Sequence, residues 1–408
     1  MGQYQEYEQY KDSGIKTIDK IPKNWQVIRL KFVAITNMGQ SPKSGDYNEQ
    51  LIGYPFLQGN AEFGKQSPNA KHYCDTVVKV CRKNDLLISV RAPVGALNIA
   101  DQRYGIGRGL CAITPLKIEQ KFLWYQLQHT KEQLLAEATG STYEAVSTHE
   151  VGNTWLNLPS SYEQKQIAQF LDYKTAQIDA LIGKKEALLK KLSEQRSAII
   201  TQAVTKGLDP TVPMKDSGIE WLGKIPEHWD IKKLRYVGSC QNGVSKGGNY
   251  FGSGYPFLSY SDVYSNSELP KKINGLAQST EADRMNYSVK VGDIFFTRTS
   301  ETIEEIGIAS TCLHHINDAI FSGFLIRVRL FNNSLIPSFS KYYFRSQKHR
   351  FFFVKEMNLV TRASLSQDLL KRLPVLLPPL EEQKQIAQFL DYKTAKIDQH
   401  KDKIKKAI

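Results

Sequence analysis

Basic and amide side chains recur in polar, glycine-rich loops along this 408-residue sequence. Arginine or lysine can hydrogen-bond guanine, asparagine or glutamine can hydrogen-bond adenine, and serine, threonine or tyrosine offer a shorter reach. The candidates are Lys43, Asn60, Lys65, Arg91, Arg103, Arg108, Thr142 and Tyr143 in the first half of the chain, and Lys246, Tyr260, Asp262, Arg298, Arg362 and Ser364 in the second. These residue types would suit a surface that binds DNA.

Each candidate also has an ordinary structural interpretation. Arg91 and Arg298 follow apolar, strand-like segments in equivalent loops, and surface salt bridges explain them about as well. Loop polarity accounts almost equally for the residues that flank the two YPFL segments, at 54–57 and 255–258. Loop packing is the alternative for the residues just before the last strand of each half. Phosphate contacts and base contacts use the same side chains, so residue type does not separate them.

Patterns that would indicate an enzyme are incomplete. Segments 59–66 and 218–225 approach a phosphate-binding P-loop but lack the Ser or Thr that ligates magnesium. Pro378–Pro379 lacks the neighbours of the base-binding tetrapeptide of amino-methyltransferases, and His149–Glu150 has no second histidine four residues later. We therefore expect no catalytic residues, no cofactor and no metal in this chain.

Composition and charge narrow the class of protein further. The net charge of +13 favours a polyanionic partner, although many basic proteins bind no nucleic acid. The five cysteines have no metal-ligand spacing and are best interpreted as buried thiols in a reducing compartment. The first residues have neither a basic nor an apolar region of a signal peptide, and no apolar run is long enough to span a membrane. We expect a cytoplasmic protein.

The elements that must position these loops are repeated. Glu163–Ala176 and Glu382–Ala395 are the same fourteen residues, 219 positions apart (382 − 163 = 219). A second repeat aligns KDSGIKTIDKIPKNW at 11–25 with KDSGIEWLGKIPEHW at 215–229, 204 positions apart (215 − 11 = 204). The chain is therefore two modules in tandem.

Both copies of the fourteen-residue repeat lie in segments with a heptad pattern of apolar residues, which predicts two long helices. Each has one narrow apolar seam that needs a partner, so we expect the two helices to pack against each other as an antiparallel coiled coil that also docks partner subunits. The seam residues are Ile167, Leu171, Ile178, Leu181, Leu188, Leu192 and Ile199 in the first helix, and Ile386, Leu390, Ile397 and Ile404 in the second. The lysines at 184, 185, 190 and 191 are better explained by a solvated helix face than by DNA or partner contact.

These landmarks predict an α+β protein with two mixed domains joined by the two helices and related by a pseudo-twofold axis. The predicted segments are an N-terminal segment 1–25, a first recognition domain 26–160, a central helix 161–206, a linker 207–228, a second recognition domain 229–378 and a C-terminal helix 379–408. The second helix stops at Ile408, which corresponds to Leu189 of the first copy, so we expect a shortened or asymmetric helix pair.

The whole chain resembles the specificity subunits of type I restriction-modification systems. The resemblance rests on KDSGIEWLGKIPEHW, on the strand-and-arginine loops at 84–100 and 292–310, on the segment 377–386 and on the duplicated helices. It implies two target recognition domains, each reading half of a bipartite DNA sequence. It also implies helices that space the domains and hold modification subunits, two of them in our expectation.

The same resemblance implies that methyl transfer to adenine and DNA cleavage belong to modification and restriction subunits. S-adenosylmethionine, ATP and magnesium would be used there and not by this chain. Since the two globular regions differ, we expect an asymmetric target. Two other functions remain open: a coiled-coil DNA-binding or scaffold protein unrelated to restriction, and a self-contained DNA nuclease or methyltransferase, which the incomplete motifs disfavour.

Overall fold

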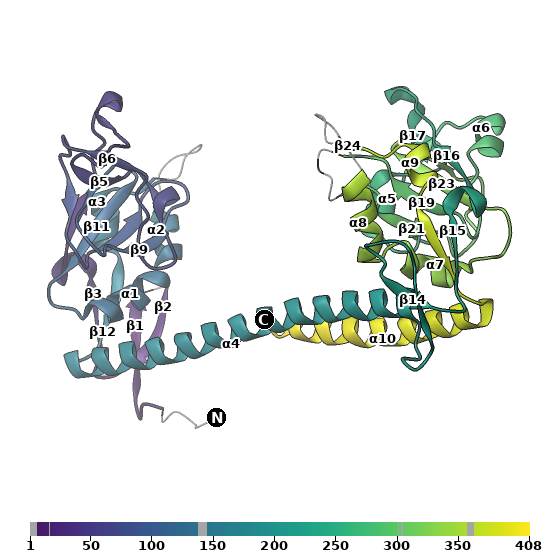
Figure 1. Cartoon of the computed structure of the whole chain (residues 1–408). Helices are drawn as coiled ribbons and strands as arrows, with labels where there is room; N and C mark the ends of the chain where they lie inside the picture. Colours follow the sequence, from purple (N-terminus) through teal and green to yellow (C-terminus); the bar gives the residue numbers. More distant parts are fainter. Residues whose placement is uncertain (1–5, 16, 138–144, 301, 303–304, 357–362) are drawn as a thin grey trace. The chain divides into compact units, whose positions relative to one another are not determined.

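The computed structural model describes residues 6–15, 17–137, 145–300, 302, 305–356 and 363–408. They form two compact units, unit 1 (Met1–Ala180) and unit 2 (Leu181–Ile408). Each unit has its own strands and short helices, whereas α4 (Ser161–Lys206) and α10 (Leu380–Lys406) are much longer (Figure 1). The predicted α+β class, with two mixed domains and two long helices, is confirmed.

Unit 1 contains an antiparallel sheet with the strand order β4-β11-β8-β9 and a mixed sheet with the order β6-β5-β10-β7, in which β10 runs parallel to β5. The first sheet comprises β4 (Ala34–Met38), β11 (Leu110–Pro115), β8 (Leu86–Ser89) and β9 (Leu97–Ile99). The second comprises β6 (His72–Cys74), β5 (Tyr54–Leu57), β10 (Tyr104–Ile106) and β7 (Val80–Cys81).

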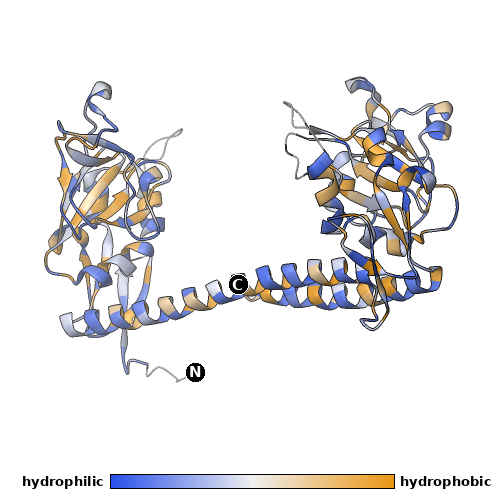
Figure 2. Cartoon of the chain, in the orientation of Figure 1, coloured by the Kyte–Doolittle hydropathy of each residue, from blue (hydrophilic) through white to orange (hydrophobic). Residues whose placement is uncertain are grey.

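The antiparallel sheet of unit 1 is buried on both faces, because successive side chains of a strand point to opposite sides. Leu86 and Ile88 of β8 belong to the cluster that includes the helices, whereas Leu87 belongs to the cluster shared with the mixed sheet. This explains why β8 is apolar at nearly every position instead of alternating. Figure 2 shows the same concentration of hydrophobic residues on the strands inside each unit.

The remaining elements of unit 1 connect the sheets to α4. Helices α1 (Gln120–Gln128), α2 (Lys131–Glu137) and α3 (Thr148–Asn153) follow the sheets. Strand β12 (Trp155–Leu158) pairs with β3 (Gln26–Arg29) and leads into α4. The start of α4 is capped by Ser160, whose hydroxyl accepts from the Glu163 amide at 3.3 Å while the Glu163 carboxylate accepts from the Ser160 amide at 3.1 Å.

Unit 2 repeats this topology. Its antiparallel sheet has the order β16-β23-β19-β21, and β17 runs parallel to β22 in a second sheet with β18. The strands are β16 (Gly238–Asn242), β23 (Leu325–Leu330), β19 (Ile294–Thr297), β21 (Ala309–Thr311), β18 (Leu276–Ala277), β17 (Phe251–Leu258), β22 (Ile320–Phe321), the pair β15 (Asp230–Lys233) and β25 (Pro374–Leu377), and the pair β20 (Thr299–Ser300) and β24 (Ala363–Ser364). The helices before α10 are α5 (Tyr260–Ser265), α6 (Glu281–Asn286), α7 (Pro337–Tyr343), α8 (Gln347–Glu356) and α9 (Gln367–Lys371).

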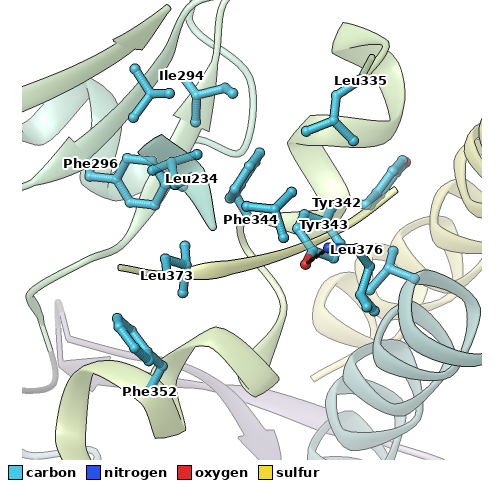
Figure 3. Packing of buried hydrophobic residues seen from close by; sticks show 14 of the residues in the cluster. Leu234, Ile294, Phe296, Leu335, Tyr342, Tyr343, Phe344, Phe352, Leu373 and Leu376 are labelled. Carbon is cyan, nitrogen blue, oxygen red and sulfur yellow. Dashed lines mark hydrogen bonds between the residues drawn. The ribbon is translucent and has the colours of Figure 1, made fainter. Parts of the chain in front are cut away.

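The main core of unit 2 joins its sheet to both long helices. Figure 3 shows Phe296, Phe344 and Tyr343 packed between strands and helices, with the Tyr343 hydroxyl accepting from the Leu376 amide at 2.7 Å. The same cluster includes Leu390 of α10 and Val204 of α4, neither of which has exposed surface. The helices of this unit are therefore part of its core.

Each repeat of the KDSGI segment forms a β-hairpin. In unit 1 this is β1 (Tyr10–Ile15) with β2 (Ile18–Pro22), and in unit 2 it is β13 (Met214–Asp216) with β14 (Lys224–Pro226). Segment 207–228, which we expected to be a linker, thus packs as folded structure, since Leu222 and Ile225 are buried in the core of unit 2. Its proline and glycine content reflects the turns of a hairpin.

Within unit 2 the C-terminal half of α4 and α10 run antiparallel, as expected. Arg196 Nε lies 3.2 Å from Asp398 Oδ1, and Lys185 donates to the Ala407 carbonyl near the end of α10. On α10 the predicted Ile386, Leu390 and Ile397 are buried. The two helices are joined by apolar contacts along this stretch.

The covered stripe of α4 differs from the predicted heptad frame, and the frame is corrected accordingly. Leu181 and Leu188 are 53% and 45% exposed, whereas Ile182 and Leu189, one residue later, are half-buried. Further along, Ala203 is buried in the same heptad position as these two. Because adjacent residues are both apolar at 181–182 and 188–189, apolarity alone did not distinguish the two frames.

Candidate nucleic-acid interface

Four strands of unit 1 end at one three-residue loop, Gly107–Gly109, which we call the junction loop. Strands β4 and β8 are both antiparallel to β11, so their C-terminal ends meet where β11 begins. Strand β5 runs parallel to β10, so both of these strands end on the other side of the loop. The topology therefore collects the loops that follow all four strands in one place.

Backbone hydrogen bonds tie these loops together in unit 1. The Gly107 amide donates to Leu57 at 2.8 Å, the Gln40 amide donates to Ile106 at 2.9 Å and the Val90 amide donates to Gly109 at 2.9 Å. A Cβ on Gly39 would overlap the Gly107 carbonyl, so only glycine permits this approach. The surface has a fixed backbone on which different side chains can be presented.

Unit 2 has the same arrangement around its own junction loop, Ser322–Phe324. The Ser322 amide donates to Leu258 at 3.0 Å, the Val244 amide donates to Phe321 at 2.9 Å and the Arg298 amide donates to Phe324 at 2.8 Å. A Cβ on Gly243 would overlap the Phe321 carbonyl, as at Gly39. The backbone frame is thus common to both units.

The side chains on the two frames are different. In unit 1 the exposed Gln58 contacts Ser41 and Tyr47, beside Arg108. In unit 2 the junction loop presents Phe324, which is 60% exposed. Hydrogen bonds of the first kind and an apolar contact of the second are both means of distinguishing base edges in a groove.

Charged groups border the unit 2 loops. Lys246 lies 3.0 Å from Asp283 and over the ring of Tyr250, whose hydroxyl also donates to Asp283 at 3.0 Å. The Thr280 amide is the main cause that lowers the pKa of Asp283 to about 2, and burial with the nearby Asp283 raises the pKa of Tyr250 to about 12. The three side chains hold one another in a defined arrangement.

Several predicted residues lie at or next to these loops. In unit 1, Arg91 and Arg108 are exposed there, Asn60 follows Gln58 by two residues, and Lys43 is exposed in the loop after β4. In unit 2 the residues so placed are Lys246, Tyr260, Arg298 and Ser364. The structure thus brings together side chains from the loops that follow β4, β5, β8 and β10, or their counterparts.

The predicted equivalence of Arg91 and Arg298 is corrected by one residue. The β-bridge between Arg91 and Ala145 in unit 1 corresponds to the pairing of Thr299 with Ser364 in unit 2. Thr299 is therefore the counterpart of Arg91, and Arg298 is the counterpart of Val90. Arg298 donates from Nη1 to the Gly323 carbonyl at 3.2 Å, which ties it to the junction loop. The two loops are equivalent, but their arginines are not.

Other predicted residues have structural partners or lie elsewhere. Lys65 pairs with Asp179 on α4 at 2.9 Å, and Arg103 precedes β10, at the opposite end of that strand from the junction loop. Asp262 caps α5 by accepting from the Ser259 amide at 2.9 Å, and the Tyr260 hydroxyl donates to the Glu305 carbonyl at 3.2 Å. Thr142, Tyr143 and Arg362 lie outside the described residues.

Gln58, Ser41 and Phe324 were not predicted. Gln58 directly follows the YPFL segment at 54–57, but glutamine and serine are common surface residues. Parallel pairing of β5 with β10 places Gln58, antiparallel pairing of β4 with β11 places Ser41, and the pairing of β17 with β22 places the loop of Phe324. All three pairings join residues far apart in the sequence. Only the position of Gln58 directly after the YPFL strand was available as a sequence signal.

The predicted helix seam is partly exposed. Ile178 on the unit 1 part of α4 is 56% exposed, Ile167 and Leu171 are half-buried, and Leu192, Ile199 and Ile404 are half-buried in unit 2.

Among the described residues no group of three or more His, Cys, Asp or Glu side chains could hold a metal ion. Cys74, Cys81, Cys111 and Cys312 are buried, and burial raises the pKa of Cys81 and Cys111 to about 12. No described helix is long and apolar enough to cross a membrane.

Comparison with known families identifies both modules. Residues 22–191 and 226–408 match the model of the type I restriction modification DNA specificity domain. The MjaX specificity subunit of Methanocaldococcus jannaschii is 37% identical over 205 residues, which are 49% of this chain and 46% of that relative. The EcoBI specificity subunit of Escherichia coli is 22% identical over 415 residues, 97% of this chain and 85% of that protein. The matched region therefore spans about half the length of the first of these relatives.

Solved structures show the same fold. A chain from work on complex assembly and conformational transition of the type I restriction-modification system has a TM-score of 0.66 at 18% identity, with 95% of this chain and 94% of that chain covered. The HsdS subunit from Thermoanaerobacter tengcongensis has a TM-score of 0.55 at 17% identity, with 95% and 92% covered.

Proposed function

The chain belongs to the family of type I restriction-modification DNA specificity subunits, and from this premise we propose that it selects the DNA sequence for a type I restriction-modification complex. Each unit reads one part of a bipartite target through the loops around its junction loop. The observation that carries this proposal is one backbone frame, present twice, with different side chains on it. That difference favours an asymmetric target.

In this proposal the chain has no catalytic activity of its own. Adenine methylation belongs to modification subunits, which the internal repeat of the chain suggests are two in number, and cleavage belongs to restriction subunits bound through them. S-adenosylmethionine, ATP and magnesium act in those partners. The exposed apolar residues of α4, among them Leu181 and Leu188, support a docking role because they are available to a partner helix.

The test of DNA selection is co-expression with a modification subunit from the same source, followed by genome-wide mapping of methylated adenines. A bipartite motif with a fixed gap of unspecified bases is the expected result. This chain expressed without the modification subunit should give no methylation, which is the control. A stable complex that methylates no defined motif would contradict the proposal.

The docking role is tested by Leu181→Asp. Since Leu181 is already exposed, the substitution should leave folding intact and reduce assembly with the modification subunit, measured by size-exclusion chromatography. The matched control is Gln177→Asp, at an exposed polar position on the same helix. An unchanged complex for Leu181→Asp would show that partners bind elsewhere.

A further inference from the structure

We propose that Gln58 is a specificity-determining residue that reads an adenine in the part of the target recognised by unit 1. This inference rests on the proposed function and specifies that Gln58 contacts adenine in the major groove. The ligand group is the major-groove edge of adenine, which offers an N7 acceptor and an N6 amino donor to a side-chain amide. Ser41 and Tyr47 act as positioning residues.

The Gln58 amide is held from two sides although it lies at the surface. Its Nε2 donates to Ser41 Oγ at 2.9 Å, and its Oε1 accepts from the Tyr47 hydroxyl at 3.3 Å. Ser41 Oγ in turn accepts from the Arg108 amide at 3.3 Å. A surface glutamine normally samples many rotamers, so these contacts reduce the conformational entropy that a base contact would otherwise cost.

The held amide keeps the two groups that adenine requires. A carboxamide has two N–H donors and an oxygen with two lone pairs. The Ser41 hydroxyl lies 2.9 Å from Nε2 and 3.3 Å from Oε1, so it bridges the edge of the amide that a bidentate contact uses. Adenine would take the place of this hydroxyl, with its N7 accepting from Nε2 and its N6 amino group donating to Oε1, while Tyr47 keeps its contact with Oε1.

The junction loop is shaped around this side chain. A Cβ on Gly107 would lie 2.7 Å from Gln58 Oε1, and a Cβ on Gly109 would lie 2.7 Å from the Gln58 carbonyl. Any larger residue at 107 would displace the amide. The glycines therefore give Gln58 its place, and Arg108 between them is exposed next to it.

The corresponding residue of unit 2, Ser259, has a different role. Ser259 follows the second YPFL segment as Gln58 follows the first, but its hydroxyl bonds the Asp262 carboxylate at 2.6 Å and accepts from the Asp262 amide at 3.3 Å. Ser259 is thus engaged as the N-cap of α5. An amide reader at this position is a property of unit 1.

The experiment uses the full chain in complex with its modification subunit and compares the wild type with Gln58→Ala by methylation mapping. We expect the preference for adenine at one position of one half-site to fall by about 5- to 100-fold, while the other half-site and the gap stay unchanged. The unchanged half-site also shows that the variant is folded. Gln50→Ala, at an exposed glutamine eight residues earlier, is the matched control and should change nothing.

Positioning is tested separately with Tyr47→Phe and Ser41→Ala. Both should weaken discrimination at the same base position and at no other, with a smaller effect than Gln58→Ala. Lys43→Ala, which removes an exposed charge, should instead weaken binding to all sequences and lower the dependence of affinity on salt.

The outcomes separate this inference from the proposed function. If the wild-type complex gives a bipartite motif and Gln58→Ala gives the same motif at every position, the inference is wrong and the proposed function stands. If Gln58→Ala abolishes methylation while Gln50→Ala does not, a base-reading role is also overturned, because the residue then supports binding as a whole. A wild-type complex without any motif contradicts the proposed function itself.

Discussion

Glu163–Ala176 and Glu382–Ala395 are identical in sequence but lie in different surroundings. In unit 2, Ile386 and Leu390 have no exposed surface, whereas their counterparts in unit 1, Ile167 and Leu171, are only half-buried. The contrast grows along the helix, where Ile397 is 8% exposed and the equivalent Ile178 is 56% exposed. The two copies of the same fourteen-residue sequence are therefore buried to different extents, more in unit 2 than in unit 1.

The difference comes from what packs on each helix. In unit 2 the last turns of α4 lie in one core with the start of α10, the hairpin β13–β14 and Trp229, which is completely buried. In unit 1 the equivalent Trp25 is only half-buried, and the residues described there include no second long helix beside it. Burial is therefore a property of the neighbours and not of the local sequence.

The largest expected effect tests that cause directly. Ala203→Asp places a carboxylate in the buried contact of α4 with the unit 2 core, and should destabilise unit 2 by about 3 kcal/mol or more. Trp229 fluorescence should report the exposure of the tryptophan. Gln202→Asp, at an exposed neighbouring position, is the control. Equal stability of the two variants would mean that the last turns of α4 do not determine the burial of unit 2.

A substitution made at both copies of the repeat gives the next largest effect. Leu390→Ala leaves a cavity in a closed core and should cost about 3 kcal/mol, whereas Leu171→Ala, at a half-buried site, should cost about 1 kcal/mol. Denaturant unfolding, followed by hydrogen exchange in each unit, measures both. Equal losses would remove the contrast between the two copies.

The helix starts also differ and predict a smaller, pH-dependent effect. Hydrogen bonds from Ser160 lower the pKa of Glu163, whereas α10 begins after Pro379 without a side-chain cap. A lowered folded-state pKa stabilises the folded state above the unfolded pKa, and this stabilisation is lost as pH falls through the folded value. Ser160→Ala should cost about 1 kcal/mol at pH 7 and less in acid, by denaturant unfolding of unit 1. A cost that does not depend on pH would exclude the capping interaction.

The smallest expected effect concerns the frame of α4. Leu188→Ala should change unit 2 stability by no more than about 0.5 kcal/mol because Leu188 is exposed, whereas Leu189→Ala should cost about 1 kcal/mol. Thermal unfolding of the two variants side by side measures the difference. The reverse order would restore the heptad frame predicted from sequence.

The sequence predicted the elements that local pattern determines. The heptad residues indicated both long helices, and the apolar runs at 86–89 and 294–297 indicated buried strands. The apolar pattern did not choose between Leu188 and Leu189, since both are apolar and only their burial in the folded chain distinguishes them. The pattern also matched Arg91 with Arg298, because similar residues suggest equivalent positions, whereas the strand register makes Arg298 the counterpart of Val90.

The candidate site was less predictable than the fold for a physical reason. Gln58, Ser41 and Arg108 meet through the parallel pairing of β5 with β10 and the antiparallel pairing of β4 with β11, which no short segment encodes. Arg108 was predicted as a basic residue in a glycine-rich loop, but the partners that surround it were not. Residue type indicated the chemistry, and long-range strand pairing brought the side chains together.

The contact between the Gly39 and Gly107 backbones, with its counterpart at Gly243, has an engineering consequence. The hydrogen bonds that join these loops are made by main-chain atoms and do not depend on most of the side chains the loops carry. The exposed side chains of these loops can therefore be varied without redesign of the sheets beneath, provided that these glycines are kept. A library that varies positions 41, 58 and 108 while fixing 39 and 107 is a rational starting point for retargeting.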